Sequence, residues 1–142
     1  LAYSTSNANN VTGAGTTYVA IPNIEVFDDG GDYNTANGTF TAAIAGRYHF
    51  DATIYYSGAT AAMTDGICEI AASNHRFFAY FNAFNIADAS GGGFCHLGGD
   101  MDMDAGDTIV SRITISSGAA NTADLLGSAT TMWNTFSGHL IR

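Results

Sequence analysis

The sequence predicts an all-β fold of the jelly-roll sandwich type, and three observations support this prediction. Gly, Ala, Ser, Thr and Asn dominate the chain, whereas the Leu, Glu, Lys and Arg that build long helices are scarce. Apolar and polar residues alternate through short runs, which is the pattern of half-buried strands. Turn-forming residues separate these runs at a spacing typical of a sandwich or barrel. Roughly eight to ten strands result, the number expected of a jelly roll.

The predicted strands follow one another along the chain with short turns between them. The first spans residues 17–27 and is interrupted by Pro22, which cannot donate to a ladder and therefore marks an edge or a bend. Further strands are predicted at residues 33–34, 39–44, 47–57, 67–72, 76–81, 94–103, 108–116 and 130–141. Turns are predicted at residues 28–32, at Asn37-Gly38 and at residues 104–107, where Asp, Asn and Gly cluster.

Residues 47–57 form the clearest predicted strand, because apolar and polar side chains alternate there without a break. The expected inward side chains are Tyr48, Phe50, Ala52, Ile54 and Tyr56. The expected outward side chains are His49, Asp51, Thr53 and Tyr55. Aromatic residues are also frequent in residues 77–84, and they are too many for one inner face, so some are expected between subunits.

The chain of 142 residues has the length of one domain with a sizeable core. Residues 1–15 are polar and Asn-rich, so we expect a partly ordered lead-in segment there, followed by a jelly-roll head over residues 16–142. No signal peptide is recognisable at the start, and no run is apolar and long enough for membrane insertion.

The charge of the chain excludes several classes of partner. Lysine is absent, and four arginines face 13 acidic residues, which gives a net charge of −9. Such a charge repels phosphate backbones, so no nucleic acid binding is expected. It equally disfavours binding to an anionic membrane surface.

Three motifs in order resemble the globular head of complement component 1q and the related tumour necrosis factor-like domains. The first runs from Gly38 to Phe50 and matches the pattern Gly-x-Phe, then Gly-x-Tyr-x-Phe, with Ala43 where that family usually has Pro. The second is Ala105-Gly106-Asp107 before a strand, and the third is Phe136-Ser137-Gly138-His139-Leu140-Ile141 at the end. The matches extend over nearly the whole chain, from about residue 18 to residue 141.

The resemblance implies a ten-stranded jelly-roll sandwich that forms a compact homotrimer around a threefold axis. It also implies that the terminal strand and its sheet line the trimer core. Residues expected in the core or in subunit contacts are Tyr48, Phe50, Tyr56, Trp133, Phe136, Leu140 and Ile141. Such heads lie outside the cytoplasm, so an extracellular location or the surface of a virion is expected.

Two acidic clusters are candidate metal sites. Asp28, Asp29 and Asp32 lie in one predicted loop, and Asp102, Asp104 and Asp107 lie around another. Hard cations such as calcium prefer carboxylate and carbonyl oxygens from loops, and some members of the resembled family bind calcium. The alternative is that these residues form solvated turns, because Asp is a favoured turn residue. No other cofactor is expected.

The cysteines and histidines leave alternatives open. Cys68 and Cys95 allow one disulfide, and two buried free thiols are the other possibility. No histidine pair has the spacing of a metal-binding motif. On a threefold axis His49 or His139 could form a ring of three, whereas a hydrogen-bonded histidine on a strand is the ordinary alternative.

No catalytic motif is recognisable, so we do not expect an enzyme. A Gly-x-Ser-x-Gly elbow is absent, no lysine is available as a base, and Gly91-Gly92-Gly93 precedes no helix.

The leading hypothesis is a trimeric recognition or adhesion head that binds a cell-surface glycan or protein. Its first form is the receptor-binding tip of a phage or viral fibre. Asn82, Phe84 and Asn85 are the candidate ligand-binding residues, since they could stack on and hydrogen-bond to a sugar. The alternatives are a structural trimerisation cap or capsid decoration domain, and a bacterial secreted or surface adhesin.

Overall fold

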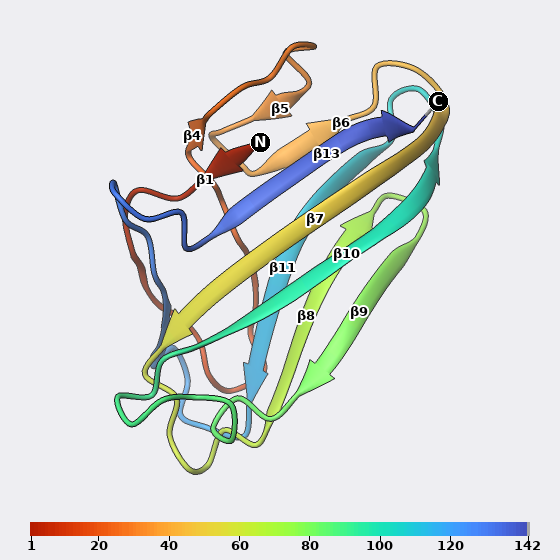
Figure 1. The fold of residues 1–142 in the computed structure, drawn as a ribbon. Helices are drawn as coiled ribbons and strands as arrows, with labels where there is room; N and C mark the ends of the chain where they lie inside the picture. Colours follow the sequence, from red (N-terminus) through yellow and green to blue (C-terminus); the bar gives the residue numbers. More distant parts are fainter. Residues whose placement is uncertain (142) are drawn as a thin grey trace.

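The structure is a computed structural model that describes residues 1–141, and in this range it consists of strands and connecting loops without a helix (Figure 1). Thirteen strands form two sheets that pack face to face. The all-β prediction is therefore confirmed. Nowhere in residues 1–141 is there a helix that could cross a membrane.

The first sheet is centred on β7, the longest strand of the structure. Its strands are β1 (Ala2–Tyr3), β2 (Ala8–Thr12), β4 (Ile24–Glu25), β7 (Gly46–Ser57), β10 (Gly93–Met103), β12 (Ala123–Leu125) and β13 (Thr135–Ile141). Strand β10 pairs with β7 along almost its whole length, while β13 and β12 share the other edge of β7. All these pairings are antiparallel.

The second sheet lies behind the first in Figure 1 and is centred on β11. Its strands are β3 (Thr17–Val19), β5 (Tyr33–Asn34), β6 (Thr39–Thr41), β8 (Asp65–Ala72), β9 (Arg76–Phe81) and β11 (Thr108–Ser116). The strand order is β5-β6-β11-β8-β9, with β3 beside β11 as well. Strand β9 is thus the edge of this sheet, on the same side of the sandwich as β10 (Figure 1).

The core lies between the two sheets and is built by the alternation that the sequence displays. Phe50, Ile54 and Tyr56 of β7 are fully buried. From the opposite sheet, Ile113 and Ile115 of β11 pack in one cluster with Ile54 and Tyr56, and Ile109 of β11 packs in a second cluster with Phe50. Burial of one such side chain stabilises a fold by about 1.5–3 kcal/mol. The inward set predicted for residues 47–57 is buried, and the outward set is not.

A disulfide crosses the core and joins the two sheets. Cys68 of β8 and Cys95 of β10 are bonded, with their Cα atoms 6.4 Å apart. Their side chains are buried among the apolar residues around Ile54 and Ile113. Of the two alternatives for these cysteines, the structure therefore has the disulfide.

The structure differs from the sequence-based expectation in its short strands. The predicted lead-in, residues 1–15, carries β1 and β2, which pair with β13 and β12. Strand β12 was not expected, and residues 17–27 divide into β3 and β4 around Pro22. There are thirteen strands where ten were expected, since six of them have only two or three residues. Such pieces are set by tertiary pairing and carry no alternating pattern of their own.

Candidate functional site: the outer face of β10, β7 and β13

The outer surface of the first sheet gathers most of the polar and aromatic groups that the core does not use. We call it the β7 face, and it consists of the outward residues of β10, β7 and β13. Because neighbouring strands are paired in register, these residues form rows across the three strands. The rows are Asp102–Arg47–Ile141, Asp100–His49–His139, Gly98–Asp51–Ser137 and His96–Thr53–Thr135, with Phe94 beside Tyr55 at the end.

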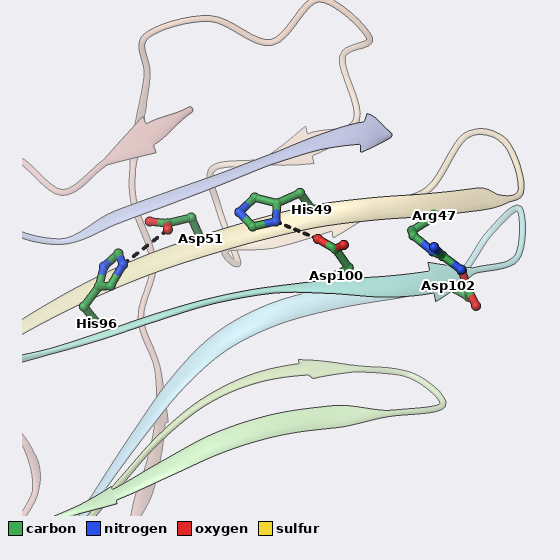
Figure 2. Close-up of polar contacts among 6 residues, drawn as sticks. All are labelled: Arg47, His49, Asp51, His96, Asp100 and Asp102. Carbon is green, nitrogen blue, oxygen red and sulfur yellow. Dashed lines mark hydrogen bonds and ion pairs between the residues drawn. The ribbon is translucent and has the colours of Figure 1, made fainter. Parts of the chain in front are cut away.

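One half of the β7 face is a series of charged and imidazole groups between β7 and β10 (Figure 2). Arg47 Nε lies 3.3 Å from Asp102 Oδ1, and His49 Nδ1 lies 2.8 Å from Asp100 Oδ1. His96 Nε2 lies 3.3 Å from Asp51 Oδ2. All these side chains are at least one third exposed. Exposed pairs of this kind contribute only about 0–1 kcal/mol to the free energy of unfolding. A gain in stability therefore does not explain why these pairs are present.

The other half of the β7 face is aromatic. The ring of Tyr55 stacks between Trp133, at a centroid distance of 5.3 Å, and Phe94, at 6.4 Å. Phe94 is 58% exposed, and the neighbouring Met132 is 51% exposed. Tyr55 and Trp133 are half-buried, so the cluster is open to solvent mainly at Phe94. Exposed apolar groups gathered in this way mark an interaction surface.

A second aromatic surface lies on β9, the edge of the other sheet. Phe78 and Tyr80 make an edge-to-face contact at 5.3 Å, and Tyr80 is 74% exposed. The Arg76 guanidinium lies 5.1 Å from the centre of the Phe78 ring. The buried carboxylate of Glu69 holds Arg76 at 3.1 Å and Arg112 at 2.8 Å. This surface therefore combines two exposed aromatic rings with a guanidinium that an ion pair holds in place, on an edge strand of the sandwich.

The predicted ligand-binding residues lie in the loop between β9 and β10. Phe84 is 44% exposed and Asn85 is exposed. The side-chain oxygen of Asn82 accepts a hydrogen bond from the backbone N–H of Asn85 at 2.9 Å, so this residue shapes the turn. The structure brings the three residues together on one surface loop, and their role in binding stays a prediction.

The first predicted metal loop is folded around one of its own carboxylates. Asp28 accepts hydrogen bonds from the backbone N–H groups of Gly31, at 3.1 Å, and Tyr33, at 2.9 Å. Partial burial raises the pKa of Asp28, but backbone hydrogen bonds from residues 30–33 outweigh this effect and lower the pKa below 3.8. Asp28, Asp29 and Asp32 line a cavity of about 360 Å³ together with apolar side chains such as Phe40 and Leu140.

The second predicted metal cluster is divided between two places. Asp102 belongs to the β7 face, whereas Asp104 and Asp107 lie in the turn between β10 and β11. Asp107 accepts hydrogen bonds from Ser73 Oγ at 2.7 Å and from Asn74 Nδ2 at 2.9 Å, so it ties this turn to the loop between β8 and β9. In the described part of the chain, no three His, Cys, Asp or Glu side chains surround a common point that could hold a metal ion. Calcium binding stays a prediction.

The residues predicted for the core or the subunit contacts fall into two groups. Tyr48, Phe50, Tyr56 and Phe136 are buried between the sheets, and Leu140 packs against the same core. Trp133 and Ile141 instead lie on or beside the β7 face, where Trp133 stacks on Tyr55 and Ile141 is 36% exposed.

Sequence reasoning did not find the rows of the β7 face. His49 and Asp51 were predicted to point outward, but the partners Asp100, His96 and His139 depend on the register between strands that are about 40 to 90 positions apart. The alternation of Asp100 and Asp102 with Met101 and Met103 was a usable signal that these carboxylates point outward. The pairing of strands that lie far apart in the sequence has no signal in a single sequence.

These features define a two-sheet β-sandwich that carries exposed aromatic and imidazole groups on its outer surface. The globular domain of zebrafish complement 1qA is similar in structure, with a TM-score of 0.61 at 18% identity over 100% of this chain and 98% of that chain. Murine APRIL, in a crystal structure at pH 8.0, has a TM-score of 0.52 at 13% identity over 96% and 92% of the two chains. At such identities the likeness establishes the fold, and the predicted complement-1q-like fold is confirmed. The chain matches no protein-family model and no curated protein sequence.

Proposed function

We propose that this protein is a non-enzymatic recognition head that acts as a homotrimer outside the cytoplasm. The single observation that carries the proposal is the stacked cluster of Tyr55, Phe94 and Trp133, which lies on the outside of a sheet whose inside is already packed and leaves Phe94 58% exposed. In the trimer, a sister copy of the chain is the proposed cover of each such cluster.

The second aromatic surface supports a contact between unlike surfaces. Phe78 and Tyr80 lie at the open edge formed by β9 and β10, and the aromatic cluster of the β7 face lies on another part of the molecule. An edge that packs on the face of the next copy is a heterologous contact, and such contacts produce a closed ring when the rotation permits. In a ring of three, both the aromatic cluster and the β9 surface of every copy are covered by a neighbouring copy.

The proposed ligand is a cell-surface glycan or protein, bound through the loop of Asn82, Phe84 and Asn85. Three copies of a weak site gain avidity when they bind one surface, because the second and third contacts form at high effective concentration. The disulfide fits an oxidising location outside the cell. The tip of a phage or viral fibre is the proposed setting, supported by a composition that is rich in Thr and Asn and lacks lysine, and a bacterial surface adhesin is the second.

Glycan-array binding of the purified protein tests this proposal. We expect binding by the wild type, at least tenfold weaker binding by the double variant Asn82→Ala and Asn85→Ala, and unchanged binding by Asn9→Ala, an exposed asparagine of β2. A trimer that binds no glycan and no host cell would instead support a structural trimerisation cap. Equal binding by the double variant and the wild type would show that the loop is not part of the binding site.

A further inference from the structure

One row of the β7 face places two imidazoles side by side and a carboxylate behind one of them. Asp100, His49 and His139 are directly opposite one another on β10, β7 and β13. The rings of His49 and His139 have their centres 5.5 Å apart and are tilted by 45°. Asp100 contacts His49 (Figure 2). Because β10 and β13 flank β7 on opposite sides, Asp100 lies on the side of His49 away from His139.

The Asp100 contact fixes which nitrogen of His49 carries the proton. An ionised carboxylate can only accept a hydrogen bond, so the Nδ1 atom of His49, 2.8 Å from Asp100 Oδ1, must be the donor. In neutral His49 the lone pair is then on Nε2, which makes no hydrogen bond within residues 1–141. The ring of His139 likewise makes none in this range. Two imidazoles with free ring nitrogens are thus held as neighbours.

His96, which lies on the same β7 face, shows the opposite arrangement. Its Nδ1 atom lies 3.0 Å from Thr53 Oγ1, and its Nε2 atom lies 3.3 Å from Asp51 Oδ2. Both ring nitrogens of His96 therefore have partners, and no other imidazole is paired with it. His96 is an internal control on this surface, because it is a solitary histidine whose two ring nitrogens both lie beside polar side chains.

We propose that His49 and His139 together bind a divalent first-row transition-metal ion of the zinc class. Imidazole nitrogen is a preferred ligand of such ions. A carboxylate that accepts the other N–H of a ligating histidine orients the ring and raises its basicity, and Asp100 has this position. Asp51, Asp100 and Asp102 carry three negative charges and Arg47 one positive, so the surroundings have a net charge of −2 while the histidines are neutral.

The pair supplies two ligands of a tetrahedral ion. Because no third His, Cys, Asp or Glu of residues 1–141 completes the site, the remaining positions are taken by water in a single chain. Where sister copies cover the β7 face, their polar groups can take these positions in place of water. The inference needs the residues of one chain only, so it does not depend on the proposed trimer.

Zinc titration of the untagged protein by calorimetry at pH 7.5 tests the inference. We expect binding in the micromolar range, and at least tenfold weaker binding by His49→Ala and by His139→Ala. Asp100→Asn should weaken zinc binding about 10- to 100-fold without lowering the melting temperature of the metal-free protein. His96→Ala should stay within twofold of the wild type, and magnesium, which prefers oxygen ligands, should not replace zinc.

Two results would overturn the inference: absence of zinc binding below millimolar concentration, or wild-type affinity in the double variant His49→Ala and His139→Ala. Circular dichroism of each variant checks that the sheets are intact. The native mass, measured with and without zinc, separates this inference from the proposed function. A monomer that binds zinc through the pair contradicts the trimer alone, and a trimer that binds none contradicts the metal site alone.

Discussion

At the scale of single residues, Gly138 shows why the last motif of the chain requires a glycine. A Cβ atom at this position of β13 would lie 2.6 Å from the ring of Phe50, which is fully buried. We expect Gly138→Ala to lower the free energy of unfolding by about 1–3 kcal/mol, because an extra methyl group overpacks the core. Urea unfolding measures this loss. Gly92→Ala is the control, since a Cβ there meets nothing closer than 3.4 Å, and equal stability of the two variants would refute the packing argument.

Tyr56 leads to a prediction about alkaline stability. Burial raises the pKa of Tyr56 to about 12, and its hydroxyl donates a hydrogen bond of 2.7 Å to the carbonyl of Ala83. A pKa that is raised on folding gives stability that is complete below the unfolded value of about 10 and is lost as the pH rises from about 10 to 12. Stability should therefore fall in this window.

The variant Tyr56→Phe isolates this contribution. It should cost about 1 kcal/mol at pH 8 through the lost hydrogen bond, and it should lose less stability than the wild type between pH 10 and 12. Urea unfolding at these pH values gives the comparison. Some alkaline loss should persist, because burial and the charge of Glu25 also raise the pKa of Tyr33. Parallel pH curves for the two proteins would contradict the assignment.

At the scale of strands, the Cys68–Cys95 bond is the covalent link between β8 and β10 and hence between the sheets. The cysteines are 27 positions apart, and closing a loop of this length in the unfolded chain is worth about 3–4 kcal/mol. Reduction should lower the free energy of unfolding by about this amount. Urea unfolding with and without reductant checks it. Reductant should not change the free energy of unfolding of the double variant Cys68→Ala and Cys95→Ala. A wild type whose free energy of unfolding is also unchanged by reductant would contradict the stabilising role of the disulfide.

The turn between β10 and β11 yields a prediction in acid. Hydrogen bonds from the Ser73 hydroxyl and the Asp104 N–H lower the pKa of Asp107 below 3.8. A lowered pKa gives stability that is present above pH 4 and is lost as the pH falls through the folded value. Asp107→Ala should therefore lower the melting temperature at pH 6, with a difference that shrinks toward pH 2.5. The control is Asp104→Ala, because the carboxylate of Asp104 accepts no hydrogen bond in the described chain, and this variant should leave the melting temperature nearly unchanged. Equal effects of the two substitutions would contradict the stabilising role of the hydrogen bonds that Asp107 accepts.

The long strands could be predicted from the sequence, whereas the short strands and the cross-strand rows could not. β7, β10 and β11 have strict alternation, and their predicted ranges differ from the observed ones by at most one residue at each end. β2 has the sequence ANNVT, which lacks that alternation, and it becomes a strand because β12 pairs with it. The row of Asp100, His49 and His139 depends on register, which is decided by the packing of the inward side chains.

At the scale of the whole molecule, the two sheets end side by side in the edge strands β9 and β10 (Figure 1). The strands β9 and β10 are open edges, and the β7 face next to them carries the aromatic cluster of Tyr55, Phe94 and Trp133. A chain with a net charge of −9 has little tendency to associate without a specific contact. Association through these surfaces should therefore be specific and sensitive to single substitutions.

The most direct test of the account is the mass of the purified protein in solution, measured by sedimentation equilibrium. We expect three times the chain mass of 14.8 kDa for the wild type and the mass of a single chain for Phe94→Glu, which puts a charge into the aromatic cluster. Phe27→Glu is the matched control, because Phe27 is equally exposed, at 58%, and lines the cavity beside His139 and Leu140 without belonging to the aromatic cluster, and it should remain a trimer. A wild-type mass of one chain, or a Phe94→Glu variant that stays trimeric, would contradict the account.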